Sequence, residues 1–336
     1  MVTEQRAVNE AKAAAQIYNS AVAAWAIAAA WELGALDELE ENGVIDSEEF
    51  SARHRLDAPS TLGMFRALAA VGVVQRDNTK VVKSEKFDEV YRARSFFHWL
   101  TRGSAELFRR MPEVVRTENR HGEFYRRDPA AIAFACREIN TLCYDSWFWS
   151  SIEGLDFDFR VVADLGCGSG ERLMDILRRY PRARGVGIDI AADSLEVARE
   201  DAVSRGLDGR LTFVEADVLA MEKRPEFDEV ELLTCFMMGH DFWPRQQCID
   251  TLARLRELFP NVRRLLIGDA TRTVGIPDKD LPVFTLGFEF AHDMMGTFIP
   301  TVADWESTFE EAGWHLRRKH SIDLLVGEQI FELEHL

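Results

Sequence analysis

The sequence predicts an α/β protein with a mostly parallel, seven-stranded sheet in its C-terminal half and a helical module in front of it. After Asp158, apolar segments of strand length alternate with helix-like segments, which is the pattern of a parallel sheet with crossover helices. The first hundred residues instead give three helices and a hairpin. A single hydrophobic core stops growing near ~250–300 residues, so a chain of 336 residues is expected to form more than one domain.

The N-terminal elements are predicted from periodicity, capping residues and turn signals. From Gln5 to about Glu40, apolar residues recur at helical spacing on more than one face, which is typical of a helix that packs on a partner. The elements that follow are a short helix capped by Asp46 and Ser47, a helix that starts at Ser60 and Thr61, and a hairpin of Val73-Val74 and Val81-Val82 around Asp77-Asn78.

This order of elements resembles a winged helix. A DNA-reading module of that kind needs cations on its second helix, yet only Arg66 is basic between Ser60 and Gly72. We therefore predict that residues 1–100 form a winged-helix-like dimerisation domain and that the protein is a homodimer. Residues 101–155 are mainly helical and rich in aromatic residues, and we expect them to bridge the domains and wall a substrate pocket.

Charge and composition exclude several classes of partner. The net charge is −17, from 40 Lys+Arg against 57 Asp+Glu, which opposes binding to nucleic acid or to an anionic membrane. The five cysteines form no Cys-x-x-Cys pair, as expected of reduced thiols in a cytoplasmic protein. The apolar run from Ala21 to Ala30 is too short to span a membrane, and no signal peptide is expected.

The C-terminal domain is expected to cover residues 156–336. Its strands are predicted at 160–165, 184–189, 211–215, 230–235, 264–268, 316–321 and 329–333, with helices at 171–179, 192–205, 244–258 and 303–312. In open sheets of this kind, ligands bind beyond the carboxyl ends of the strands.

The loop after the first of these strands has glycine at every second position. The segment from Val161 to Gly170 reads Val-Val-Ala-Asp-Leu-Gly-Cys-Gly-Ser-Gly, so a ligand can approach bare backbone. Its spacing differs from the G-x-G-x-x-G of dinucleotide sites and from phosphate loops, which end in Gly-Lys-Ser/Thr. Asp-x-Gly-x-Gly-x-Gly resembles the first motif of the class I S-adenosylmethionine (SAM) methyltransferases. The resemblance implies a Rossmann-like methyltransferase domain that holds SAM at Asp164, Gly166, Gly168 and Gly170, where Asp164 either steers the amino group of SAM or fixes the loop.

Further cofactor residues are expected at the next strand ends. Asp189 ends the second strand, where an acidic side chain can accept hydrogen bonds from both ribose hydroxyls; the alternative is a cap for the helix at 192–205. Asp217 follows the third strand and resembles the family residue that accepts from the adenine amino group, or else it forms a turn. Phe236, at the end of the fourth strand, is also assigned to the cofactor.

Two His-Asp pairs follow the fourth and fifth strands. His240-Asp241 lies where plant-type O-methyltransferases carry a His that takes the proton of the substrate hydroxyl. His292-Asp293 is the second pair, and adjacent strand ends are expected to bring His240 and His292 together. Two imidazoles and a nearby thioether such as Met237 suit a borderline transition metal. On the residues alone, a core or orienting role for His292 is the simpler interpretation.

Three segments resemble the 2-oxo acid C-methyltransferases of nonribosomal peptide biosynthesis, namely Phe236-Met-Met-Gly-His-Asp-Phe-Trp-Pro244, Gly268-Asp-Ala-Thr-Arg-Thr-Val-Gly-Ile-Pro277 and Phe284-Thr-Leu-Gly-Phe-Glu-Phe290. The likeness extends from the N-terminal helix to the last strand. It implies a non-haem iron, or alternatively zinc or another divalent transition metal, held by Met237, His240 and His292. It also implies that Arg127, Trp99 and Asp241 contact the substrate, and that Asp241, Arg127 and His240 are catalytic.

The resemblance implies SAM-dependent methylation of the β-carbon of a 2-oxo acid, either phenylpyruvate or a branched aliphatic one, to supply a β-methyl amino acid precursor for a peptide natural product. Such a carbon becomes nucleophilic only after a proton leaves, and a Lewis-acidic metal stabilises the enolate that forms. Asp241 would orient His240 or a metal-bound water, or it would cap the helix at 244–258. The group that removes the proton is one of three candidates: metal hydroxide, Asp241 or solvent. The alternative function is a metal-independent O-methyltransferase of a small phenolic or hydroxylated metabolite, with His240 as general base. A winged-helix regulator that senses SAM is disfavoured by the acidic charge.

Overall fold

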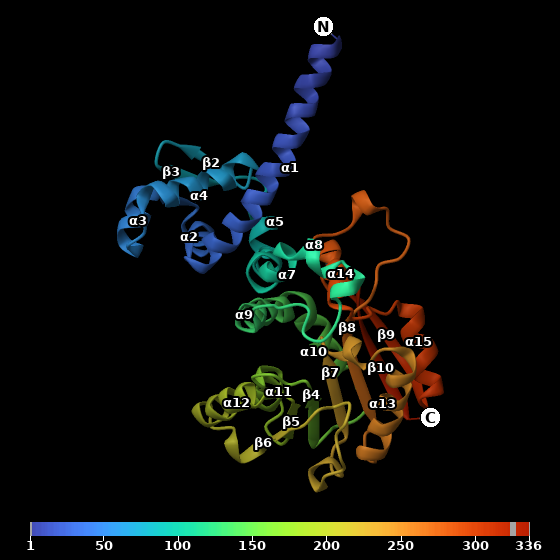
Figure 1. Ribbon diagram of the computed structural model, residues 1–336. Helices are drawn as coiled ribbons and strands as arrows, with labels where there is room; N and C mark the ends of the chain where they lie inside the picture. The colour runs from blue at the N-terminus through green and yellow to red at the C-terminus, as the bar shows by residue number, and fades with distance from the viewer. Residues whose placement is uncertain (1, 323–326, 336) are drawn as a thin grey trace. The chain divides into compact units, whose positions relative to one another are not determined.

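The computed structural model describes residues 2–322 and 327–335, and the chain divides into two compact units, residues 1–142 and 143–336 (Figure 1). The boundary between the units lies within the segment 101–155 that the sequence predicts as a bridge. Among the described residues, no helix is both long and apolar enough to cross a membrane.

Unit 1 is helical apart from a small antiparallel sheet of order β1-β3-β2. The hairpin of β2 and β3 is the one predicted around Asp77-Asn78. In chain order the elements are α1 (Val2–Glu32), α2 (Ala35–Asn42), β1 (Val44–Asp46), α3 (Ser47–His54), α4 (Ala58–Ala70), β2 (Val74–Asp77), β3 (Lys80–Lys83), α5 (Phe87–Arg92), α6 (Arg94–His98), η1 (Trp99–Gly103), α7 (Ala105–Arg109), α8 (Met111–Val114), η2 (Thr117–Asn119) and α9 (Pro129–Ile139).

Two helix boundaries in unit 1 differ from the prediction, each for a local reason. The helix predicted from Gln5 to Glu40 is two helices, because Gly34 adopts a φ of 77° and separates α1 from α2. The helix predicted to start at Ser60 is α4, which begins at Ala58. It starts earlier because the carboxylate of Asp57 accepts a hydrogen bond from the Ser60 N–H at 2.9 Å and caps the helix.

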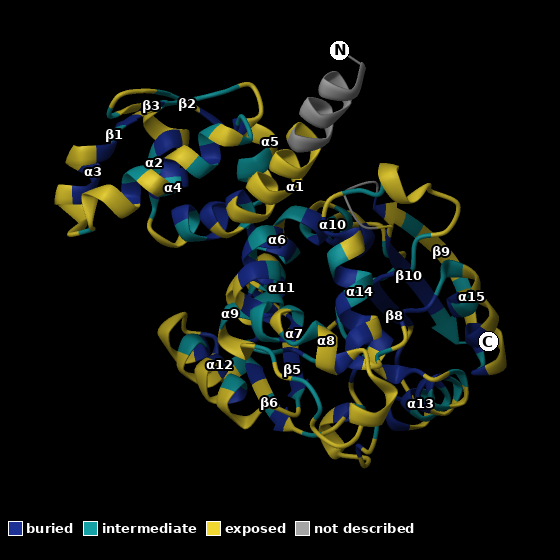
Figure 2. Cartoon of the chain, turned by 45° about the horizontal axis from the view of Figure 1, so that its top comes forward, coloured by how far each residue is buried: buried dark blue, intermediate teal, exposed yellow. Residues whose placement is uncertain are grey.

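The first helix keeps apolar side chains on its surface, and the exposed colour marks several of its residues in Figure 2. Ile17, Tyr18 and Trp25 are each more than half exposed. A groove of about 480 Å³, lined mainly by apolar side chains such as Val22 and Met64, lies between α1 and α4. Monomeric proteins rarely expose contiguous apolar surface of this kind, so the α1 face has the character of an interaction surface.

Unit 2 contains the predicted seven-stranded sheet, in the order β6-β5-β4-β7-β8-β10-β9. The first five strands in this order run parallel, and β10 pairs antiparallel with both β8 and β9. The predicted mostly parallel α/β fold is therefore confirmed. Its strands are β4 (Val161–Leu165), β5 (Arg184–Asp189), β6 (Leu211–Glu215), β7 (Leu232–Phe236), β8 (Arg264–Ala270), β9 (Trp314–Ile322) and β10 (Glu328–His335), each within two residues of the predicted ends.

Helices and short turns connect these strands. In chain order they are η3 (Asn140–Tyr144), which crosses the unit boundary, α10 (Asp145–Glu153), α11 (Glu171–Arg179), α12 (Ala192–Ser204), η4 (Asp208–Arg210), η5 (Pro225–Phe227), η6 (Gly239–Phe242), α13 (Arg245–Leu258), η7 (Asp278–Asp280), α14 (Thr285–Met295) and α15 (Val302–Glu311).

The sheet topology determines which residues share an edge. β4 pairs with β5 on one side and with β7 on the other, so the strand order reverses at β4, and ligands of open α/β sheets bind at such a point. Because β10 runs antiparallel, its first residue, Glu328, lies at this same edge, opposite Ala270 at the end of β8. Every residue of β8 is buried, as are the first six of β10 (Figure 2).

Candidate functional site

The glycine loop joins the end of β4 to the start of α11. Gly166, Gly168 and Gly170 all have positive φ, between 53° and 71°, a conformation that L side chains rarely adopt. A Cβ at Gly166 would also lie 2.5 Å from the sulfur of Met238, whereas a Cβ at Gly168 would meet nothing within 4 Å. The loop therefore packs tightly against β7 at Gly166 and presents open backbone at Gly168.

Asp189 holds this loop from the end of β5. One carboxylate oxygen accepts a hydrogen bond from the Gly168 N–H at 2.8 Å, and the other accepts from the Ala191 N–H at 2.8 Å. No side chain caps α12 at its N-cap residue, Ala191. Asp189 is thus a half-buried carboxylate directly beside the open part of the glycine loop, which is the placement expected of a ribose-binding residue.

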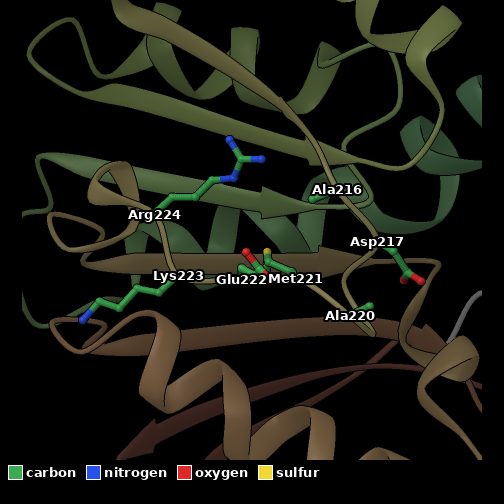
Figure 3. Close-up of a pocket in the computed structure, with 7 residues that line it drawn as sticks. All are labelled: Ala216, Asp217, Ala220, Met221, Glu222, Lys223 and Arg224. Carbon is green, nitrogen blue, oxygen red and sulfur yellow. The ribbon is translucent and has the colours of Figure 1, made fainter.

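Asp217 lies one strand further along the same edge. The Ala216 N–H donates to the carbonyl oxygen of Asp189 at 3.0 Å, which connects the two strand ends. Asp217 is exposed and borders a pocket of about 450 Å³ formed by the segment after β6 (Figure 3). Its side chain accepts a hydrogen bond from the Leu219 N–H at 2.9 Å, which is the contact expected of the turn-forming alternative.

Asp164 lies beneath the loop in a buried, charged environment. Thr234 donates its hydroxyl to Asp164 at 2.5 Å. Burial raises the pKa of Asp164 to about 6, and the nearby Arg172 guanidinium and the Thr234 hydrogen bond oppose this rise. Arg172 is half-buried, and its guanidinium lies 4.1 Å from the ring centre of Phe236. A carboxyl and a guanidinium at this position complement the ammonium and carboxylate of an amino acid group.

His240 is oriented by Asp269, a buried residue near the end of β8. The Asp269 carboxylate accepts from the His240 backbone N–H at 2.6 Å and pairs with His240 Nδ1 at 2.9 Å. It also accepts from the Ala270 N–H at 2.8 Å. Because the carboxylate accepts at Nδ1, the neutral His240 ring carries its lone pair on Nε2.

His292 lies beside His240, as the sequence predicts, but the last turn of α14 brings it there rather than a strand end. The two imidazole ring centres are 5.2 Å apart and the rings are nearly perpendicular. His292 Nδ1 lies 2.7 Å from the carbonyl oxygen of Phe288. A carbonyl can only accept, so the neutral His292 ring also carries its lone pair on Nε2. Both rings are buried.

Met237 and Met238 turn in different directions. Met237 has a positive φ of 56°, and its sulfur accepts a hydrogen bond from the Tyr144 hydroxyl at 2.9 Å. Met238 packs its sulfur against Gly166 of the glycine loop. The two consecutive side chains therefore belong to two neighbouring parts of the site.

The residues implied as metal ligands fit a metal with borderline preferences. Proteins orient His ligands by giving the second ring nitrogen a carboxylate or carbonyl partner, and His240 and His292 each have one. Among the described residues, no group of three or more His, Cys, Asp or Glu could hold a metal ion. The third ligand that the resemblance implies is the thioether of Met237, a donor that soft or borderline metals accept.

The other predicted substrate residues are found in both units. In unit 1, Trp99 is buried, and the guanidinium of Arg127 lies 5.6 Å from its ring centre. In unit 2, Asp241 is exposed within η6, next to His240 in the chain. The N-cap of α13 is Pro244, and this residue makes no side-chain hydrogen bond to the helix.

Sequence reasoning missed four residues of this region, namely Tyr144, Arg172, Asp269 and Glu328. Asp269 could have been found from the sequence, since it is an acidic residue that directly follows the apolar residues 265–268 of β8. Glu328 could not, because only the antiparallel pairing of β10 with β8 brings it to this edge.

Comparison with known sequences supports a methyltransferase. The description "Methyltransferase domain" matches residues 162–259, from the first strand of the sheet to the end of α13. The chain is 50% identical over 329 residues to Methyltransferase ungE' of Aspergillus campestris, with 96% of each chain covered. It is also 26% identical over 317 residues to Indolepyruvate C-methyltransferase of Streptomyces griseus, covering 91% of this chain and 90% of that protein.

Solved structures share the fold over nearly the whole chain. The mitomycin 7-O-methyltransferase MmcR aligns with a TM-score of 0.66 at 18% identity, covering 99% of this chain and all of that one. The pyocyanin biosynthetic protein PhzM aligns with a TM-score of 0.69 at 19% identity, covering 98% of this chain and all of that one.

Proposed function

Because this chain belongs to the SAM-dependent methyltransferases, we propose that it transfers the methyl group of SAM to the β-carbon of a 2-oxo acid. The observation that carries this proposal is the pair of His240 and His292, whose rings converge and whose Nδ1 atoms are both held by acceptors. A hydroxyl-methylating enzyme needs one base, whereas two oriented imidazoles suit metal binding. The likeness to an indolepyruvate C-methyltransferase supports the same choice.

The cofactor is proposed to lie along the edge formed by β4, β5 and β6. The glycine loop would face the amino acid moiety of SAM, with Asp164 and Arg172 supplying opposite charges beneath it. Asp189 would accept from the ribose hydroxyls and Asp217 from the adenine amino group. Phe236, under the Arg172 guanidinium, would contact the cofactor near the reacting methyl.

We propose that Met237, His240 and His292 hold a non-haem iron, with zinc or another divalent transition metal as the alternative. Such a metal would act as a Lewis acid that stabilises the negative charge of the enolate. Asp269 and the Phe288 carbonyl keep both imidazoles in the tautomer with Nε2 available, and Tyr144 orients the sulfur of Met237.

Arg127, Trp99 and Asp241 are the proposed substrate-contacting residues. The guanidinium of Arg127 can bind a carboxylate through two parallel hydrogen bonds, and the indole of Trp99 offers apolar surface to the substrate side chain. Phenylpyruvate and branched aliphatic 2-oxo acids both match this chemistry. The methylated product would be a precursor of a β-methyl amino acid in a peptide natural product.

The test is to incubate the purified enzyme with methyl-labelled SAM and either phenylpyruvate or 4-methyl-2-oxovalerate, and to locate the label by NMR. A label on the β-carbon supports the proposal, and a label on oxygen contradicts it. Metal analysis of protein purified without a histidine tag accompanies this assay. Fully active protein that contains no metal would disprove the metal-dependent form of the proposal.

O-methylation of a small phenolic or hydroxylated metabolite is the second candidate. The observation that favours it is the His240 pair with Asp269, since a carboxylate-oriented imidazole is a suitable general base. It predicts that His292→Ala retains turnover and that His240→Ala loses it. Loss of turnover in both variants favours C-methylation.

We also propose that the chain is a homodimer that covers the exposed α1 face with a second copy of unit 1. The exposed Ile17, Tyr18 and Trp25 and the adjoining apolar groove support this arrangement.

A further inference from the structure

Glu328 is a wholly buried carboxyl group that lies near the Tyr144 hydroxyl and the Asp269 carboxylate. Its residue is 0% exposed, and neither carboxylate oxygen has a hydrogen-bond partner among the residues at 2–322 and 327–335. Buried polar groups are almost always paired, because an unpaired one destabilises the fold. A carboxyl in this condition is more typical of a functional site than of a structural one.

The surroundings of Glu328 connect it to the proposed reaction site. Glu328 lies close enough to two residues of this region for them to change its pKa: Asp269, which holds His240, and Tyr144, which donates its hydroxyl to Met237. It also lies opposite Ala270 at the edge where the parallel strands end. Burial raises the pKa of Glu328 to about 8, the charge of Asp269 adds to this rise, and the nearby Tyr144 hydroxyl opposes it.

The neighbouring groups already have assigned hydrogen bonds. The oxygens of Asp269 accept from three N–H groups, two of His240 and one of Ala270. Tyr144 and the Nδ1 atoms of His240 and His292 act as donors. Glu328 is therefore the group in this cluster whose oxygens are best able to take up a proton, and a base that titrates near neutral pH is well matched to this task.

We propose that Glu328 is the proton acceptor of the reaction, an inference that rests on the C-methylation proposed above. The β-carbon C–H bond of the 2-oxo acid breaks, its proton adds to a carboxylate oxygen of Glu328, and the electron pair forms the enolate. The enolate carbon then bonds to the methyl carbon as the sulfonium S–CH₃ bond breaks, which leaves neutral S-adenosylhomocysteine. Glu328 keeps this proton during methyl transfer and passes it to water that enters the site when the product leaves.

The experiment follows proton removal separately from methyl transfer. Wild-type enzyme, Glu328→Gln and Glu328→Asp are mixed with phenylpyruvate in D₂O without SAM, and NMR measures deuterium entry at the β-carbon above the buffer rate. Glu328→Gln is expected to lower this exchange and the methylation kcat together by about 100-fold or more, with an unchanged Kd for SAM by calorimetry. Glu328→Asp is expected to restore part of both rates.

The control variant is Glu334→Gln, which changes a carboxylate on the same strand that is ion-paired with Arg264 and Arg317. It should exchange and methylate like wild type. Exchange by Glu328→Gln at the wild-type rate, in protein that melts no lower than wild type, overturns the role of Glu328 and leaves C-methylation standing. If wild type instead places the methyl on oxygen, C-methylation and the role of Glu328 are both refuted.

Discussion

Replacing Glu328 with Gln should make the protein more stable at alkaline pH. The folded protein keeps the Glu328 proton up to a pKa of about 8, whereas the unfolded chain releases it near the ordinary value of 4.5. Between these two values the unfolded state binds fewer protons, so the stability of the wild type falls as the pH rises and stays low above about pH 8. Glutamine has no proton to lose, so the variant should not show this decline.

The size of the effect follows from the two pKa values. Each pKa unit corresponds to about 1.4 kcal/mol, so the wild type carries a cost of about 5 kcal/mol at high pH that the variant lacks. Unit 2, residues 143–336, has a size at which one kcal/mol shifts Tm by about 2–4 °C. The variant should therefore melt on the order of 10 °C above wild type at high pH.

Thermal unfolding of the two proteins, followed by circular dichroism at about pH 5 and about pH 8.5, measures this difference. The two Tm values should nearly coincide at the lower pH and separate at the higher one. Glu334→Gln, a change at a partly exposed and ion-paired carboxylate, should show no such gain. Equal separation at both pH values would refute the assignment of a buried, proton-retaining carboxyl.

Three further predictions concern the cofactor, the metal and the dimer. Asp189→Ala should raise the Kd for SAM by about 10–100-fold, since it removes charged hydrogen bonds worth about 1.5–3 kcal/mol; calorimetry checks this, and an unchanged Kd contradicts the ribose role. His292→Ala should lose bound metal by elemental analysis while keeping the wild-type Kd for SAM, whereas retained metal would remove His292 from the ligand set. Trp25→Glu places a charge on the exposed α1 face and should give monomers by light scattering; an unchanged mass would place any subunit interface elsewhere.

The sequence predicts best where structure depends on local pattern. The strands and the glycine loop follow from apolar runs and from glycines that must adopt positive φ, and both lie where expected. The first residue of a helix is harder to predict from sequence. Asp57 and Ser60 are both residue types that cap helices well, and the structure shows that Asp57 is the N-cap of α4. The proximity of His240 and His292 was predicted from adjacent strand ends, and the two rings do meet, but His292 reaches His240 from the last turn of α14.

Other parts of the site depend on contacts that no local pattern contains. Glu328 reaches this edge only through the antiparallel register that pairs it with Ala270. Asp269 becomes the partner of His240 only when η6 folds over the end of β8, whereas the sequence draws attention to the adjacent Asp241. Tyr144, far from Met237 in the chain, reaches its sulfur through the packing of unit 2.

The consecutive residues Met237 and Met238 have a mechanical consequence. Met238 packs against Gly166 of the glycine loop, and Met237 turns toward Tyr144, on the side of the proposed metal ligands. Successive Cα atoms of a trans-peptide chain are about 3.8 Å apart, whatever the surrounding side chains do. The spacing between the two halves of the site is therefore set at this point by covalent bonds. Thermal motion changes the lengths of covalent bonds far less than it changes the distances between packed side chains. A displacement of the glycine loop would be transmitted to Met237 through a single peptide unit.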